Sequence, residues 1–419
     1  MDFREIKERI RRKVQERLDF RRDFDDEEVN EIIDETMLDE VDMITLPVAE
    51  RRKLRQEVFN SLRKLDILQQ YVDDSSVTEI MINGLEHIFV ERAGCLQEIE
   101  EHFDSSEKLA DVIQQIVAGC NRVVNEASPI VDARLANGSR VNIVMNPIAL
   151  NGPIVTIRRF PDKPITMDGL IALGSITEEA ATFLRLLVQS GYNIFISGGT
   201  GSGKTTFLNV LSGFIPKSDR VITIEDSAEL QLQGIPNLVR LETRNSNVEG
   251  CGEITIRDLI RSSLRMRPDR IIVGEVRGAE AIDMLQCLNT GHDGSMSTGH
   301  ANSTVDMMAR IENMVLMGVE LPLAAIRQQI ASGLDIVVHL GRLRDRSRKV
   351  LEISEVTGYE EGEIKLRCLY KFEETGQTRE GKVVGQLQRK NCLENKEKLR
   401  LAGLSLPKLE KKPTISGGI

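Results

Sequence analysis

The stretch NIFISGGTGSGKTTFLNVLSGFI, residues 193–215, contains the pattern that decides the fold of this chain. Its residues Gly198 to Thr205 match G-x-x-x-x-G-K-[ST], directly after an apolar strand pattern and directly before a helix pattern. That context is typical of a P-loop, in which backbone N–H groups surround the β-phosphate of a nucleotide. The residues predicted to bind the nucleotide are Gly199, Thr200, Gly201, Ser202, Gly203, Lys204, Thr205 and Thr206.

Two side chains of this loop have predicted roles of their own. Lys204 is placed to neutralise the β- and γ-phosphates, and the Thr205 hydroxyl is placed to bind Mg²⁺. The chain has no N-K-x-D sequence, which is the guanine signature, so the pattern favours ATP over GTP. The expected cofactors are therefore ATP and Mg²⁺.

Strand and helix patterns alternate on both sides of the loop, from about residue 171 to 345. This rhythm predicts an α/β fold with a mostly parallel sheet and helices on both faces. The predicted domains are a helical N-terminal segment, an α+β N-terminal domain, the P-loop domain, and a C-terminal β-hairpin with a loosely ordered polar tail, at residues 1–70, 71–162, 163–345 and 346–419.

The first predicted helix carries an apolar stripe on one face. Phe3, Ile6, Ile10, Val14 and Leu18 recur at spacings of three and four, as in an amphipathic helix. The stripe packs within its own domain, or it docks on a partner or a membrane surface, and the spacing leaves both interpretations open.

Acidic residues end the next two strand patterns after the P-loop. VITIEDSAEL delivers Glu225, Asp226 and Glu229, and RIIVGEVRG delivers Glu275. The carboxyl ends of such strands line the nucleotide crevice, where an acid holds Mg²⁺ through water or orients the attacking water. Gly274 stands where an aspartate is usual, so the assignment of Glu225 and Glu275 as base or metal holder stays open. Helix capping is the alternative role for both acids.

Two of the five histidines lie in NTGHDGSMSTGHANS, residues 289–303. GSMSTGH is expected to form a strand beside the P-loop strand, with His292 at its entry and His300 at its end. Eight extended residues span roughly 26 Å, so a shared zinc ion or a catalytic dyad is disfavoured. His300 is instead expected to sense the γ-phosphate.

Arginines form a further group of candidates, since P-loop enzymes often complete their sites with arginines from another domain or subunit. Arg134, Arg140, Arg158 and Arg159 lie before the P-loop domain, whereas Arg240 and Arg244 lie within it. A surface position or an ordinary ion pair is the alternative for each of them.

The composition limits the class of protein. The net charge of −10 argues against a general nucleic-acid binder, which needs a cationic face. Six scattered cysteines without a C-x-x-C pair argue against a zinc ribbon or a disulfide framework and fit a reducing, cytosolic setting. No apolar run approaches the ~20 residues that span a bilayer, and the charged N-terminus has no secretory h-region. Any membrane link is therefore expected to go through a partner or a surface contact.

Four motifs, in the order in which they occur along the chain, resemble those of a known family. GGTGSGKTT, ITIEDSAEL, VGEVRG and TGHDGSMSTGHANS resemble the secretion-superfamily ATPases of type II and type IV secretion and of type IV pilus assembly. With DARLANGSRVNIV and GRLRDRSRKVLEISEVTG, the chain looks most like the CpaF-type branch, the ATPases of Flp (Tad) pilus assembly. The likeness covers roughly residues 40–375.

The resemblance implies a homohexameric ring in which an N-terminal domain swings against a RecA-like ATPase domain as MgATP is hydrolysed. It implies docking on the cytoplasmic face of inner-membrane platform proteins, and hence peripheral membrane association through partners. It also implies that N-terminal-domain arginines reach the γ-phosphate, and Arg140 and Arg158 match those positions best. The candidate catalytic residues are therefore Lys204, Glu225, Glu275, His300, Arg140 and Arg158.

Two other functions stay open beside a motor for pilus assembly or protein secretion. One is a conjugation-type ATPase acting in nucleoprotein transfer, although the acidic charge and the lack of a basic, aromatic-rich tract argue against direct contact with nucleic acid. The other is a nucleotide-binding scaffold that hydrolyses little ATP.

Overall fold

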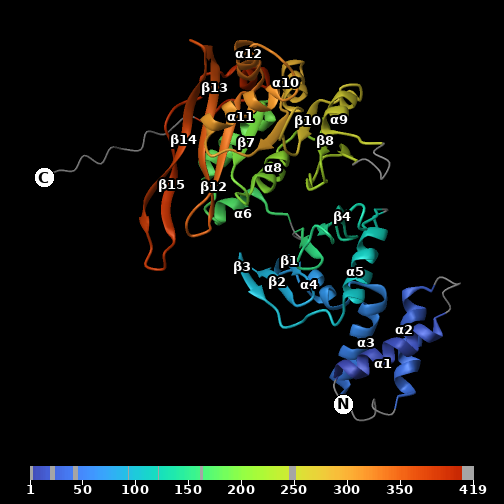
Figure 1. Ribbon diagram of the computed structural model, residues 1–419. Helices are drawn as coiled ribbons and strands as arrows, with labels where there is room; N and C mark the ends of the chain where they lie inside the picture. The colour runs from blue at the N-terminus through green and yellow to red at the C-terminus, as the bar shows by residue number, and fades with distance from the viewer. Residues whose placement is uncertain are drawn as a thin grey trace. The chain divides into compact units, whose positions relative to one another are not determined.

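Two structural units make up the chain, Met1–Lys163 and Pro164–Ile419 (Figure 1). The computed structural model describes residues 3–18, 24–40, 46–92, 94–120, 122–160, 164–244 and 252–407. The predicted boundary at residues 162 and 163 lies outside the described residues.

Three helices form a small bundle at the start of the first unit: α1 (Phe3–Arg17), α2 (Asp26–Leu38) and α3 (Val48–Arg63). Asp25 caps α2, since its carboxylate accepts the Glu28 N–H while the Glu28 carboxylate accepts the Asp25 N–H. One apolar core joins the three helices and contains Ile6, Ile10, Val14, Val29, Ile33, Leu54 and Val58. The predicted stripe on α1 is therefore a helix face that packs within its own bundle.

The rest of the first unit is an antiparallel sheet of six strands with the order β3-β2-β1-β6-β5-β4. Helix α5 shares its core through Leu109 and Ile113, which lie with Ile80 of β1. The same core takes in Leu65 and Leu68, and helical structure continues to Asp73, past the predicted residue 70. The elements are η2 (Asp66–Leu68), α4 (Gln69–Asp73), β1 (Val77–Asn83), β2 (His87–Arg92), β3 (Cys95–Glu98), α5 (Ser106–Ala118), β4 (Ile130–Arg134), β5 (Arg140–Val144) and β6 (Ile154–Arg158).

The second unit is built on a sheet of nine strands with the order β15-β14-β13-β12-β7-β11-β10-β8-β9. The six strands from β12 to β9 are parallel, as the alternating pattern predicted. The elements are α6 (Met167–Ala172), α7 (Glu178–Gln189), β7 (Ile194–Gly198), α8 (Lys204–Ser212), β8 (Arg220–Glu225), β9 (Asn237–Glu242), α9 (Ile256–Ser263), β10 (Arg270–Val273), α10 (Ala281–Asn289), β11 (Met296–Gly299), α11 (Thr304–Leu316), α12 (Leu323–Gly333), β12 (Ile336–Arg342), β13 (Arg348–Glu360), β14 (Glu363–Gln377), β15 (Val383–Arg389) and α13 (Glu397–Leu401).

Two separate cores cover the two faces of this sheet. Leu184 of α7 and Leu208 of α8 lie in one core with Ile196 of β7, whereas helices α9 to α12 form the other core with Phe195. Every residue of β7 is buried, as expected for a central parallel strand covered on both sides. The predicted α/β fold with helices on both faces is confirmed.

The predicted C-terminal hairpin is formed by β13 and β14, but the segment after it is ordered as β15 and α13 rather than loose. Strands β13, β14 and β15 extend the P-loop sheet through antiparallel pairing with β12, so residue 346 begins no separate domain. Leu387, Leu393 and Leu399 are buried in the core that contains β7. These leucines are widely spaced in a polar stretch, so the local sequence does not indicate that they are buried. They are buried because they pack on core residues that are distant in the chain. Residues 408–419 lie outside the described residues.

Within the described parts of the chain, no helix combines the length and the apolar character that crossing a membrane requires.

Candidate nucleotide-binding site

The P-loop follows β7 and leads into α8 with the backbone that its glycines require. A side chain at Gly198 would place its Cβ 2.4 Å from the carbonyl oxygen of Leu340, so the close approach of β12 demands glycine. Gly201 and Gly203 have φ angles of 70° and 93°, which only glycine adopts without strain. Gly199 has open space at the corresponding position. The predicted loop is thus formed at the carboxyl end of a central strand.

Lys204 lies at the first position of α8 and its ammonium group is held over the loop. Its Nζ donates to the carbonyl oxygens of Gly198 and Gly199 at 3.1 and 3.0 Å. The same Nζ lies 3.3 Å from Nδ1 of His300. Burial lowers the pKa of Lys204, and the charge of Glu275 partly opposes that shift. A nucleotide phosphate would supply the negative charge that this buried ammonium group favours.

His300 lies at the end of β11 and joins the P-loop to the acid after β10. Its Nε2 lies 2.8 Å from Oε1 of Glu275, on the opposite side of the ring from Lys204. Burial, followed by the charge of Lys204, lowers the pKa of His300. A neutral ring can accept the Lys204 N–H at Nδ1, whereas Oε1 of Glu275 lies near Nε2 without a hydrogen bond. The structure therefore brings together three residues predicted from separate motifs.

Arg277 completes this network and was not among the predicted residues. Its Nη2 lies 2.5 Å from Oε2 of Glu275, and its Nη1 lies 3.8 Å from Oδ2 of Asp226. Arg277 thus hydrogen-bonds one carboxylate oxygen of Glu275, and the other lies close to His300 without a hydrogen-bond partner. The only sequence signal was the arginine two positions after the acid in VGEVRG.

Glu225 has a different environment from Glu275. Its side chain is buried, and Oε2 accepts the N–H groups of Glu229 and Leu230 at 2.7 and 2.8 Å. In this position it fixes the start of the loop that follows β8. A Cβ at Gly274 would lie 2.9 Å from Cγ of Glu225, which explains why glycine replaces the usual aspartate there.

The remaining predicted residues of the loop also suit a magnesium nucleotide. Thr205 and Thr206 lie in the first turn of α8, where backbone N–H groups point out of the helix. Thr205, Glu275 and Asp226 offer a hydroxyl and carboxylates, which are the hard oxygen donors that Mg²⁺ prefers. No cluster of three or more His, Cys, Asp or Glu side chains suited to a metal occurs in the described ranges. The phosphates would therefore have to complete the coordination, as is usual for Mg²⁺ in nucleotide sites.

The two histidines of the 289–303 segment have different neighbours. His292 Nδ1 lies 3.3 Å from the carbonyl oxygen of Cys287, at the end of α10. Strand β11 begins only at Met296, so the extended stretch between the histidines is shorter than predicted. His292 thus belongs to the entry of the strand, and His300 belongs to the P-loop network.

Arg140 and Arg158 are direct neighbours in the sheet of the first unit. They face each other across β5 and β6, and Arg134 on β4 continues the same row. Arg158 also lies 3.5 Å from Glu79 on β1. Paired residues of neighbouring strands point to the same face, so the sheet presents a row of arginines on one side.

The other arginines considered from the sequence have contacts within their own units. Arg159 donates to backbone carbonyls of Asp74 and Val77. Arg240 donates to the carbonyl of Leu230, and Arg244 donates to the carbonyl of Gly252. These contacts tie loops to strands.

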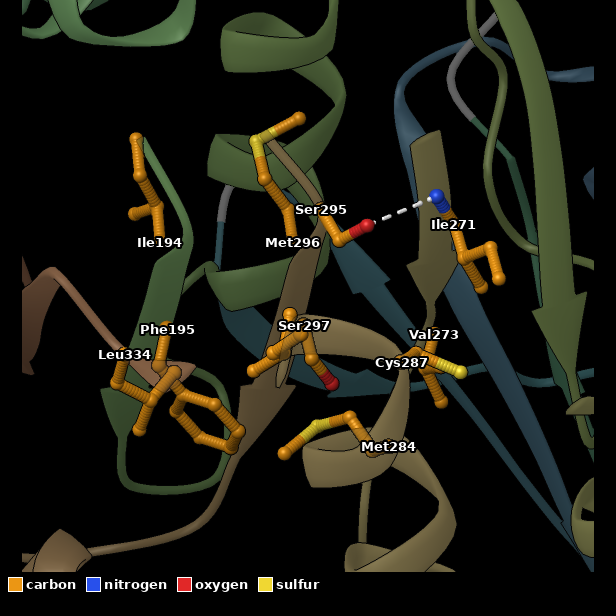
Figure 2. Close-up of a pocket in the computed structure, with 11 residues that line it drawn as sticks. Ile194, Phe195, Ile271, Val273, Met284, Cys287, Ser295, Met296, Ser297 and Leu334 are labelled. Atoms are coloured by element: carbon orange, nitrogen blue, oxygen red, sulfur yellow. Dashed lines mark hydrogen bonds between the residues drawn. The ribbon is translucent and has the colours of Figure 1, made fainter. Parts of the chain in front are cut away.

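A small cavity lies inside the second unit, between the sheet and α10 (Figure 2). Its volume of about 10 Å³ is close to that of a single water site. Its walls are mostly apolar and include Phe195, Met284 and Leu334, and no P-loop residue after β7 contributes to them. The cavity is a packing gap, and the candidate nucleotide site is the P-loop.

Known proteins resemble the chain over most of its length. The profile of the family described as Type II/IV secretion system protein matches residues 61–400. A putative conjugal transfer protein of Mycobacterium tuberculosis is 34% identical over 313 residues, which cover 71% of this chain and 88% of that protein. The type IV secretion system protein PtlH of Bordetella pertussis is 31% identical over 315 residues, which cover 69% of this chain and 93% of PtlH.

One solved structure gives a comparison of fold. The X-ray structure of the Yersinia pseudotuberculosis ATPase DotB aligns with a TM-score of 0.50 at 18% identity, covering 71% of this chain and 79% of DotB. The predicted relation to type II and type IV secretion proteins is confirmed by the profile and by the identities of the relatives. With a P-loop built as the family motifs predicted and a match that begins within the third helix, the chain belongs to the type II/IV secretion system protein family.

Proposed function

We propose that this chain is a motor ATPase that hydrolyses MgATP to power Flp/Tad pilus assembly or type II/IV protein secretion. It works as a homohexamer in the cytoplasm, at the inner face of the cell membrane, and engages inner-membrane platform proteins there. The observation that carries the proposal is the continuous contact from Lys204 through His300 to Glu275, because it links the P-loop to two neighbouring strand ends.

This contact suits hydrolysis better than mere nucleotide binding. Binding needs only the loop amides and Lys204, whereas Glu275 is an acid that can orient a water molecule or hold Mg²⁺ through water. His300 contacts both Lys204 and Glu275. A displacement of Lys204 when the phosphates change would therefore move the His300 ring and alter its contact with Glu275. Bound MgATP supplies the phosphoryl group, and Lys204 stabilises the charge on it.

Three further residues have proposed roles. Glu225, held by two backbone N–H groups, supports the loop beside the phosphates. Arg140 and Arg158 complete the site by reaching the γ-phosphate when the first unit closes on the second, and their adjacency in one sheet lets them act together.

Removal of the Lys204 ammonium group tests this function directly. Lys204→Ala in the full chain is expected to reduce phosphate release from MgATP by about 100-fold or more, because a fixed charge on the transferred group is lost. Lys217→Ala, which changes an exposed lysine in the loop after α8, is the matched control. Equal turnover in wild type and Lys204→Ala, with both proteins folded, contradicts the proposal.

Conjugation is the second candidate function, and the relatives named as conjugal transfer proteins favour it. A conjugation-type ATPase would serve nucleoprotein transfer, whereas the net charge of −10 disfavours direct contact with DNA. Phosphate release measured with and without DNA at rising salt separates the two. Stimulation by DNA that fades with salt supports the conjugation candidate, and its absence supports the pilus or secretion motor.

A further inference from the structure

The hairpin between β12 and β13 lies against the outer side of the P-loop. Strand β12 pairs with β7 in a register that places Leu340 opposite Gly198. Ser197 and His339, one residue earlier on each strand, are joined by a hydrogen bond of 2.8 Å between Oγ and Nδ1. The hairpin therefore starts where the P-loop starts, and the two segments are held in fixed register.

Two arginines at the base of this hairpin reach the P-loop. Arg342 and Arg348 face each other across β12 and β13. Arg348 Nε donates to the carbonyl oxygen of Gly201 at 2.9 Å, and its Cδ lies 3.5 Å from the position of a Cβ at Gly203. An Nη atom of Arg342 lies 3.9 Å from the position of a Cβ at Gly201. Both guanidinium groups thus lie along residues 201–203.

These two arginines differ in their charge balance from Arg344, which lies in the same hairpin. Arg344 forms a two-point ion pair with Glu374, at 2.7 and 2.5 Å. Within the described ranges, neither Arg342 nor Arg348 has a carboxylate at ion-pair distance, and both are exposed. Two positive charges are therefore held beside the phosphate-binding loop without an anionic partner from the described protein.

We propose that Arg342 and Arg348 bind, from the same subunit, the α- and β-phosphates that ATP and ADP share. The amides of Gly201 to Gly203 are those that surround the β-phosphate in a P-loop, and the guanidinium groups lie beside them. A planar guanidinium offers several N–H donors and suits phosphate oxygens. The inference rests on the proposed nucleotide function and adds two residues to it. They act on shared phosphates, in contrast to Arg140 and Arg158 at the γ-phosphate.

The experiment measures affinity by titration calorimetry on the full chain, with MgADP and with a non-hydrolysable MgATP analogue. Arg342→Ala and Arg348→Ala are each expected to raise the dissociation constants of both nucleotides by about tenfold or more. This is the effect of losing one charge-assisted hydrogen bond. The ratio of the two dissociation constants should stay constant. Arg348→Lys should recover part of the affinity, because it keeps the charge but loses the planar donors.

Arg344→Ala is the matched control, since it removes an arginine of the same hairpin that already has a carboxylate partner. Its affinities should equal those of the wild type. Affinities within twofold of the wild type for both Arg342→Ala and Arg348→Ala overturn the inference, as does a loss confined to the ATP analogue. A lower melting temperature of the nucleotide-free variants with unchanged affinities likewise overturns it, because the arginines would then only hold the loop.

The same titrations separate this inference from the proposed function. If the wild type binds MgADP and the arginine variants bind it with the same affinity, only the proposed role of Arg342 and Arg348 is contradicted. If wild type binds neither nucleotide, the proposed function falls and this inference falls with it.

Discussion

Glu275 illustrates at the residue scale how the two oxygens of one acid differ. Oε2 bonds Arg277, whereas Oε1 lies near His300 without a hydrogen-bond partner and is the oxygen free to accept from a water molecule. Arg277 has the more exposed side chain, at 61% against 36% for His300. The contact of Glu275 with Arg277 is therefore open to solvent on the arginine side, which weakens it relative to a buried pair. His300 lies between Glu275 and Lys204 through its two ring nitrogens.

The first prediction compares the two histidines of the 289–303 segment. His300→Ala should lower kcat by about 100-fold, the lower end of what a positioned acid or base contributes, while His292→Ala should change it little. Steady-state phosphate release from MgATP checks both variants. Equal and mild effects from the two substitutions would mean that the segment acts only as a polar strand.

The second prediction concerns pH and follows from the two lowered pKa values. Burial lowers the pKa of His300 below 6.5 and that of Lys204 below 10.5. His300 is thus neutral at pH 7 and gains a proton only as the pH falls through its lowered pKa, when its charge opposes Lys204. Lys204 loses its proton as the pH rises through its own lowered pKa, and then no longer neutralises phosphate.

A profile of kcat/KM against pH should therefore be flat near neutrality, with an acid limb below 6.5 and an alkaline limb below 10.5. His300→Gln should remove the acid limb and leave the alkaline limb in place. Persistence of the acid limb in that variant would assign it to another group.

At the scale of elements, the site depends on strands β7, β11 and β10 ending side by side. The P-loop follows β7, His300 follows β11 and Glu275 follows β10. Parallel strands end at one edge of the sheet, so residues distant in the chain meet there. Strand β12 closes the other side of β7 so tightly that Gly198 has no room for a methyl group.

The third prediction tests this close contact between β12 and the P-loop. Gly198→Ala should lower the free energy of unfolding by about 2–4 kcal/mol, because a methyl group would press on the carbonyl of Leu340. Gly199→Ala is the matched control, since a Cβ there meets open space, and it should stay within about 1 kcal/mol. Denaturant unfolding of both variants measures the difference. Equal stability would show that β12 yields to accommodate the methyl group.

The molecule as a whole consists of a unit with a row of arginines and a unit with a P-loop. The row places Arg140 beside Arg158, and the P-loop unit supplies Lys204, Glu275 and His300 from its own strands. The proposed function assigns Arg140 and Arg158 of the first unit and Lys204 of the second to the same reaction. The family match begins at residue 61, near the end of the α1–α3 bundle.

The fourth prediction follows from this division of roles. Arg140→Ala and Arg158→Ala should each lower kcat by about tenfold or more while the affinity for MgADP stays near that of the wild type, since the γ-phosphate is absent from ADP. Phosphate release and ADP titration on the same preparations check the split. Unchanged kcat in both variants would remove these arginines from the site.

By itself, the sequence determined the P-loop motif and the parallel sheet, and it singled out Glu275 and His300 as candidates for the site. These features depend on residues that are close together in the chain. The P-loop motif is a run of eight residues, and each strand or helix is indicated by a short periodic pattern of apolar residues. Only the tertiary structure decided that Arg277 engages Glu275, that Glu225 supports a loop, and that the C-terminal strands extend the same sheet. Arg348 and Gly201 meet across 147 positions of the chain, and Ser197 and His339 across 142. Contacts of that range depend on strand order and on packing between distant segments, which no local pattern of residues specifies.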